Sequence, residues 1–160
     1  EDGMFKPKNA VTRAEFVKML INLFRADVEI PEDFMNPFSD IKEGDWFKDI
    51  MLKANIIGIV NGDGAFARPN DEISRQEMAS MIYRMIKQQG KNLNTDTQII
   101  KFADLDKIAD WAYTPVLKMQ AAGIILGYDG RFMPEENATR AMAAQMLYNP
   151  MNSFEEEETA

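Results

Sequence analysis

The sequence predicts a mainly α-helical fold of repeated helix, glycine-rich turn, helix units, with short extended segments in the turns. The first observation is a four-residue segment that occurs three times, as Thr12-Arg13-Ala14-Glu15, Ser74-Arg75-Gln76-Glu77 and Thr139-Arg140-Ala141-Met142. The second is that a Gly, a Phe and a Pro precede each copy in the same order. The third is that apolar residues follow each copy at the spacing of one helix face. Copies that begin 62 and 65 residues apart indicate supersecondary units that share one core.

Further matches define the extent of the repeats. The residues Phe38, Asp40, Trp46, Gly58 and Gly62 match Phe102, Asp104, Trp111, Gly123 and Gly127 in order. We therefore predict one module over residues 1–160, with complete repeats at 38–90 and 102–150 and an acidic tail at 151–160. Residues 1–30 correspond to the second half of a first repeat, whose first helix is missing.

Composition narrows the classes of function. The chain has 160 residues, of which 46% are hydrophobic, so it can bury a core. Its net charge of −8 disfavours nucleic acid or an anionic membrane surface as partners, and no apolar run is long enough for membrane insertion. The absence of Cys and His removes thiol and imidazole chemistry and most transition-metal sites. We expect no cofactor, no metal and no catalytic residues.

Each complete repeat should contain two helices. An apolar series at helical spacing follows Asp45, which is a good N-cap residue, and Gly58 should end that helix. Asp110 and Gly123 stand in the same places in the next repeat. The glycine-rich turns at 61–66 and 127–132 follow, and the second helix of each repeat begins at the repeated segment.

Capping explains most of the repeated segment. Thr12 with Glu15, and Ser74 with Glu77, have the spacing of a capping box, in which hydroxyl and carboxylate each accept a backbone N–H. In the third copy Met142 stands in place of the Glu, so the cap should depend on Thr139 alone.

The arginine of the segment needs another explanation, because a cation in the first turn opposes the helix dipole. Its partner is either an internal carboxylate, such as Asp40 or Asp104, or an external anion that also uses free helix N-terminal amides. Trp46 and Trp111 likewise have two interpretations: core contact, which is the commoner role, or an apolar platform for a sugar ring.

Together these motifs resemble the S-layer homology family of bacterial surface proteins. The resemblance rests on Phe-x-Asp before each Trp, Ala122-Gly123-Ile124, the Gly-x-Asp-Gly-x-Phe of 127–132 and the Thr-Arg-Ala-Glu segment, and it covers nearly the whole chain. It implies three units about a pseudo-threefold axis. It also implies a secreted protein at the bacterial cell wall, exported under a signal peptide that lies outside this sequence.

The resemblance further implies non-catalytic anchoring through grooves between the repeats. The expected ligand is an anionic secondary cell wall polysaccharide, which in this family often carries a pyruvate ketal. The implied ligand-binding residues are Arg13, Arg75, Arg140, Trp46, Trp111, Gly62, Asp63, Gly127 and Tyr128. We expect the groove that uses Arg75 to be the best preserved. Because the first repeat lacks a helix, self-association or helix exchange between protomers is a way to complete it.

Anchoring has three alternatives, which are a glycan-cleaving enzyme, a calcium-binding loop and a protein-docking module. The carboxylates available for a glycoside-cleaving pair are Asp63, Glu72, Glu77 and Asp129, and capping and turn formation are sufficient roles for them. A calcium loop centred on Gly64 would begin at Ile59 and end at Asn70, so both anchoring carboxylates are missing. A module that docks other surface proteins stays open, because repeat arrays often bind proteins.

Overall fold

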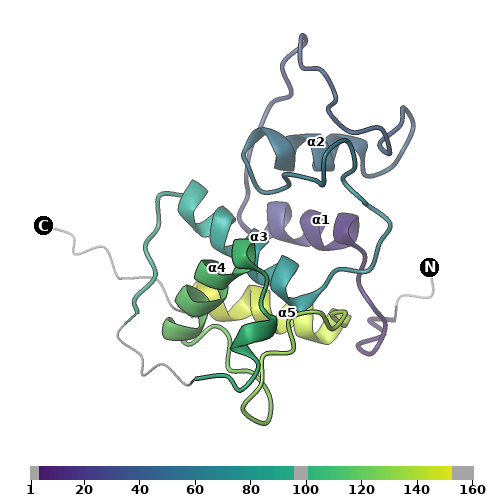
Figure 1. The fold of residues 1–160 in the computed structure, drawn as a ribbon. Helices are drawn as coiled ribbons and strands as arrows, with labels where there is room; N and C mark the ends of the chain where they lie inside the picture. The colour runs from purple at the N-terminus through teal and green to yellow at the C-terminus, as the bar shows by residue number, and fades with distance from the viewer. Residues whose placement is uncertain (1–3, 96–100, 153–160) are drawn as a thin grey trace, which may run out of the picture.

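The computed structural model describes residues 4–95 and 101–152, so most of the acidic tail lies outside the described residues. Within these ranges the chain is helical and has only isolated β-bridges, which confirms the predicted mainly α-helical fold. The elements are α1 (Arg13–Leu23), α2 (Lys48–Ile56), α3 (Arg75–Gln88), η1 (Leu105–Lys107), α4 (Asp110–Ala121), α5 (Arg140–Tyr148) and η2 (Asn149–Asn152) (Figure 1).

The three helices that begin at the repeated segment form the centre of the molecule. α1, α3 and α5 all contact one another. Just before their caps, three buried residues form a closed ring of backbone hydrogen bonds: Val11 donates to Ala138 at 3.1 Å, Ala138 to Ile73 at 2.8 Å and Ile73 to Val11 at 2.9 Å. The ring joins the three repeats cyclically. The pseudo-threefold axis itself stays a prediction.

The outer helices pack across the repeat boundaries. α2, from the second repeat, packs on α1 of the first, and α4, from the third repeat, packs on α3 of the second (Figure 1). Among the described helices, α2 and α3 belong to one repeat, but no Cα atom of one lies within 8 Å of a Cα atom of the other. The unit that repeats in sequence is therefore not the pair that packs in space, because the glycine-rich turn carries the chain away from its own first helix.

The predicted caps of the outer helices are wrong in detail. α2 begins at Lys48 with Phe47 as N-cap, while the Asp45 carboxylate accepts the Lys42 N–H at 2.6 Å and closes the preceding turn. α4 has Ala109 as N-cap and Asp110 as its first residue. Gln76, on α3, accepts the Ala109 N–H at 3.0 Å, so a side chain from the neighbouring helix takes part in the start of α4.

The central helices have the caps that their sequences describe. Thr12 with Glu15 and Ser74 with Glu77 form complete capping boxes. In α5 the Thr139 hydroxyl accepts the Met142 N–H at 3.3 Å, without a carboxylate to complete the box.

Candidate functional site

The repeated arginines link each repeat to the next through a backbone carbonyl. The Nε of Arg13 donates to Ala67 O at 3.0 Å, that of Arg75 to Phe132 O at 2.7 Å, and that of Arg140 to Phe5 O at 2.8 Å. Each acceptor lies two positions before the Pro of its turn. The arginines therefore connect the first repeat to the second, the second to the third and the third to the first.

The helix N-terminal amides are used in the same cycle. Arg13 N donates to Asp71 O at 2.9 Å and Ala14 N to Pro69 O at 2.9 Å, and α3 and α5 do the same with their neighbouring turns. The third amide bonds to the cap hydroxyl in each helix. The idea that free N-terminal amides hold an anion is thus wrong, because carbonyls of the next repeat already occupy them.

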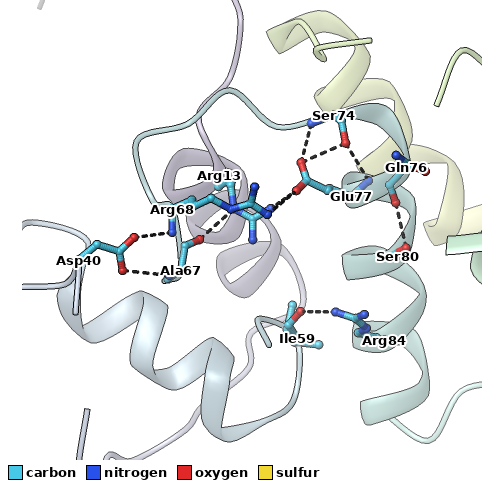
Figure 2. A network of polar contacts seen from close by, with 10 residues as sticks. All are labelled: Arg13, Asp40, Ile59, Ala67, Arg68, Ser74, Gln76, Glu77, Ser80 and Arg84. Atoms are coloured by element: carbon cyan, nitrogen blue, oxygen red, sulfur yellow. Dashed lines mark hydrogen bonds and ion pairs between the residues drawn. The ribbon is translucent and has the colours of Figure 1, made fainter. Parts of the chain in front are cut away.

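The three arginines differ in what surrounds their charge. Arg13, which is 5% exposed, forms an ion pair of 2.6 Å with Glu77, and Arg68 lies 3.7 Å from the same oxygen (Figure 2). Burial lowers the pKa of Arg13, and the positive charges of Arg68 and Arg84 lower it further. The negative charge of Glu77 acts in the opposite direction and raises it. The guanidinium nevertheless stays charged at neutral pH.

Among the described residues, no carboxylate lies within 4.0 Å of the Arg75 guanidinium. Arg75 is 8% exposed, its NH1 lies 3.7 Å from Met142 Sδ, and its guanidinium sits 5.3 Å from the centre of the Phe132 ring. Burial lowers the pKa of Arg75 although Glu136 and Asp104 oppose this. Arg140 is half-buried and lies 5.4 Å from the Phe5 ring centre. Met142 has therefore replaced the charge partner that Glu77 provides to Arg13.

The two aspartates proposed as arginine partners hold the turns instead. Asp40 accepts the N–H of Ala67 at 2.9 Å and of Arg68 at 2.7 Å, and Asp104 accepts those of Phe132 and Met133, both at 2.8 Å. Burial alone would raise the pKa of Asp104, but the backbone hydrogen bonds outweigh it and lower the pKa. Each aspartate thus orients the carbonyl that receives an arginine without pairing with the arginine itself.

Gly62 and Gly127 shape the turns that line the grooves. Both have positive φ, +71° and +69°. A Cβ on Gly62 would overlap the Phe38 ring, and one on Gly127 would come within 2.6 Å of the Phe102 ring. Packing alone therefore explains why glycine occupies these two positions of the predicted site, since no side chain fits there.

A first groove, lined by Arg13 and Trp111, brings predicted residues from all three repeats together. It has a volume of about 440 Å³ and also contains Gly62 and Asp63. The rest of its lining is Ile59, Asn61, Arg68, Glu77, Ser80, Met81 and Arg84. Three guanidinium groups and two carboxylates therefore meet beside one indole.

The second and third grooves use equivalent positions and are less complete. The second groove, beside Arg75 and Gly127, measures about 80 Å³ and is lined mainly by apolar residues such as Ile125 and Met142. The third groove, beside Arg140 and Trp46, measures about 570 Å³ and lacks a glycine turn. The expectation that the Arg75 groove is the best preserved is therefore not met, because it has neither a tryptophan nor the carboxylate.

A larger hollow lies elsewhere. It measures about 650 Å³, lies between α1 and α2, and contains Trp46 but none of the three repeated arginines. Size alone would select it as the site. The first groove is the better candidate, because it is where predicted residues of different repeats converge.

Both tryptophans are surface residues. Trp46 is 58% exposed and Trp111 is 50% exposed, so neither is a core residue. The edge of Trp46 meets Phe47, with ring centres 5.5 Å apart, and Lys18 Nζ lies 5.3 Å from the Trp46 ring centre. Tyr128 is exposed as well but lines none of these three grooves. An exposed indole face in a groove suits an apolar ligand surface.

Sequence reasoning missed Arg68 and Arg84, which both line the first groove. Neither belongs to a repeated motif: Arg68 corresponds to Met133 in the next repeat, and Arg84 to Asn149. A helical-face comparison would have found Arg84, because it lies seven residues after Glu77 and therefore on the same face of α3.

Membrane-spanning helices and clustered metal ligands are both absent from residues 4–95 and 101–152. No helix there has the length and apolar content to cross a bilayer. In the same part of the chain no three acidic side chains are grouped so that they could hold a metal ion.

Comparison with known proteins gives the chain its family. The sequence model of the S-layer homology domain matches residues 1–17, 37–79 and 101–144. An amylopullulanase of Thermoanaerobacterium thermosulfurigenes is 36% identical over 148 residues, which are 92% of this chain and 8% of that enzyme. The S-layer protein sap of Bacillus anthracis is 28% identical over 154 residues, 96% of this chain and 18% of that protein.

A cellulosome-anchoring protein of Acetivibrio thermocellus is 29% identical over 150 residues, 91% of this chain and 33% of that protein. The chain thus spans a third or less of these relatives. The family match, in contrast, falls on three segments that together make up most of the chain. This chain belongs to the S-layer homology domain family.

Proposed function

We propose that this chain is a non-catalytic cell-surface anchoring module that binds an acidic polysaccharide of the bacterial wall in its first groove. The observation that carries the proposal is the meeting of Arg13, Arg68 and Arg84 with the half-exposed Trp111 in a groove of about 440 Å³. Guanidinium groups bind carboxylates through paired hydrogen bonds, and an indole face packs on the apolar face of a sugar. A pyruvate ketal on a sugar supplies both features at once.

The relatives support this location and role. Several carry names of surface proteins, such as S-layer protein, cell surface glycoprotein and cellulosome-anchoring protein. Others carry names of enzymes, but the amylopullulanase and the exoglucanase XynX share only 8% and 13% of their length with this chain. What the enzymes and the surface proteins have in common is a module of this kind, so its place is the cell surface.

Calorimetry with wall polysaccharide fragments, before and after removal of pyruvate, tests the proposal. Trp111→Ala should weaken binding about fivefold or more, since stacking on an aromatic contributes on the order of 1 kcal/mol or more. Tyr113→Ala is the matched control, because Tyr113 is also an exposed aromatic on α4 but does not line the groove.

Three outcomes are informative. Loss of affinity on removal of pyruvate supports the ketal as the acidic group that is bound. Unchanged affinity would show that the chain binds a different acidic group of the glycan. If the chain still binds walls from which the polysaccharide has been removed, its partner is a protein and not the glycan. Equal effects of Trp111→Ala and Tyr113→Ala would contradict the first groove as the site.

A second candidate role concerns α5, and it is self-association. α2 covers α1 and α4 covers α3, whereas no described helix occupies that place on α5. Ala141 is consequently exposed, although the equivalent Ala14 and Gln76 are buried. A helix from a second copy of this chain would cover the face. Sedimentation equilibrium tests this role, and a monomer up to high micromolar concentration would contradict it.

A further inference from the structure

Arg84 occupies the groove-facing side of α3. Glu77, Ser80 and Arg84 lie at helical spacings of three and four residues, and all line the first groove together with Trp111 of α4. In Figure 2 the Arg84 side chain extends from α3 toward Ile59, apart from the cluster of Arg13, Arg68 and Glu77. The groove therefore has two separate centres of positive charge.

The two centres differ in how far they are neutralised. Arg13 donates its Nε to Ala67 O and its NH1 to the Glu77 carboxylate, and it is almost fully buried. Arg84 donates only NH1, to Ile59 O at 3.1 Å, and among the described residues no carboxylate lies within 4.0 Å of it. Burial lowers the pKa of Arg84, which reflects a partly desolvated charge. Its remaining N–H groups are the available donors on the groove side of α3.

The second groove shows that the charge of Arg84 is not needed for its backbone contact. Asn149 holds the equivalent position on the α5 side and donates its Nδ2 to Ile124 O at 2.9 Å, which is the same contact that Arg84 makes with Ile59 O. Asn22 holds the equivalent position in α1. An amide is therefore sufficient to bind this carbonyl, and the guanidinium in the first groove has a use beyond the fold.

We infer that Arg84 is a specificity-determining residue that contacts an anionic group, carboxylate or phosphate, of a sugar whose ring lies on Trp111. The repeated Arg13, already paired with Glu77, acts as a positioning residue that holds the groove wall. The inference rests on the proposed glycan-binding function. It adds the residue that binds the anionic group of the ligand. A charge-assisted hydrogen bond in a partly desolvated groove changes affinity by about tenfold or more.

The test uses nuclear magnetic resonance titrations of the whole chain with glucuronic acid, glucose 6-phosphate and glucose. The two tryptophans give separate reporters, since the Trp111 indole N–H reports on the first groove and the Trp46 indole N–H on the third. In Arg84→Asn, the dissociation constant of the anionic sugars measured at the Trp111 signal should rise about tenfold. The dissociation constant of glucose at the Trp111 signal, and the dissociation constants measured at the Trp46 signal, should stay constant.

Two further variants complete the design. Arg25→Asn removes the same charge outside the first groove at a residue with positive φ, which Asn tolerates, and it should leave the Trp111 titrations unchanged. Asn22→Arg places the guanidinium beside Trp46 in the third groove, and it should tighten binding of the anionic sugars read at Trp46. Urea unfolding of each variant establishes that the fold is kept.

Each result decides the inference. Loss of affinity in Arg84→Asn for glucuronic acid alone identifies a carboxylate, and loss for glucose 6-phosphate alone identifies a phosphate. If the anionic sugars bind Arg84→Asn and the unchanged chain with equal affinity, Arg84 does not bind the anionic group. The proposed glycan-binding function would not be contradicted by that result. If neither sugar acid nor wall polysaccharide shifts the Trp111 signal of the unchanged chain, the proposed function fails together with the inference.

Discussion

The carboxylate of Glu77 serves two repeats at once through its two oxygens. Its Oε2 accepts the Ser74 N–H at 2.9 Å and closes the capping box of α3, while its Oε1 accepts Arg13 NH1 at 2.6 Å from the neighbouring repeat. The start of one helix is thereby tied to the start of another that lies 64 residues away in the sequence. One side chain couples local capping to assembly of the core.

Glu77→Gln should lower the free energy of unfolding by about 2 kcal/mol, because it leaves the buried Arg13 charge without its partner while an amide oxygen still caps the helix. Urea unfolding measures the change. Glu15→Gln is the matched control, since Glu15 has the same capping role but forms no ion pair within 4.0 Å among the described residues. Equal destabilisation by the two substitutions would show that capping, not the ion pair, explains the effect.

Met142→Glu should raise the free energy of unfolding by about 1 kcal/mol. The new carboxylate would complete the capping box with Thr139 and would pair with Arg75, whose NH1 now lies 3.7 Å from the Met142 sulfur. Thermal and urea unfolding test this at pH 7. Met142→Gln separates the two contributions because it restores the cap without the charge. A Glu variant less stable than the Gln variant would refute a favourable ion pair at Arg75.

Asp104 should make stability depend on pH below about 4. Its pKa in the folded chain lies below the ordinary value of 3.8, so its contribution is present above that value and is lost as the pH falls through the lower, folded pKa. Asp104→Asn should cost about 2 kcal/mol at pH 7, and the difference from the unchanged chain should shrink below pH 4. Urea unfolding from pH 2 to 7 measures both, with the exposed Asp129→Asn as control.

Gly62→Ala should destabilise the fold by about 3 kcal/mol, since a Cβ there combines a left-handed backbone with overlap on the Phe38 ring and the Phe66 carbonyl. Gly64→Ala has a similar φ of +59° but open space around it, so it should cost about 1 kcal/mol. The comparison of the two melting curves separates backbone strain from steric overlap. Similar losses in both variants would mean that Phe38 moves aside at little cost.

Much of the local structure was predictable from the sequence. The capping residues Thr12, Ser74 and Thr139 and the helical spacing that follows them placed α1, α3 and α5, because a cap and an amphipathic stripe act within a few residues of each other. The same local reasoning was wrong for Asp45, where a nearby backbone amide competes for the carboxylate. Local rules therefore identify the helices better than they identify their first residues.

The partners of the arginines were decided by tertiary structure. Aspartates at the right sequence positions, such as Asp104, are equally good candidates on paper, but in the fold they bind backbone amides, and Arg13 meets Glu77 instead. The exposure of the tryptophans was decided in the same way, because α2 and α4 pack across repeat boundaries that no sequence period reveals.

What the sequence alone determined is the family, the repeat and the positions of the central helices, since these follow from periodic and short-range patterns. What only the folded chain decided is which of three related grooves is complete and which cation in it lacks a counter-charge. The physical reason is that each groove is assembled from side chains far apart in the sequence. Single differences such as Met142 for Glu77, or Asn149 for Arg84, change its charge only after the repeats have been brought together.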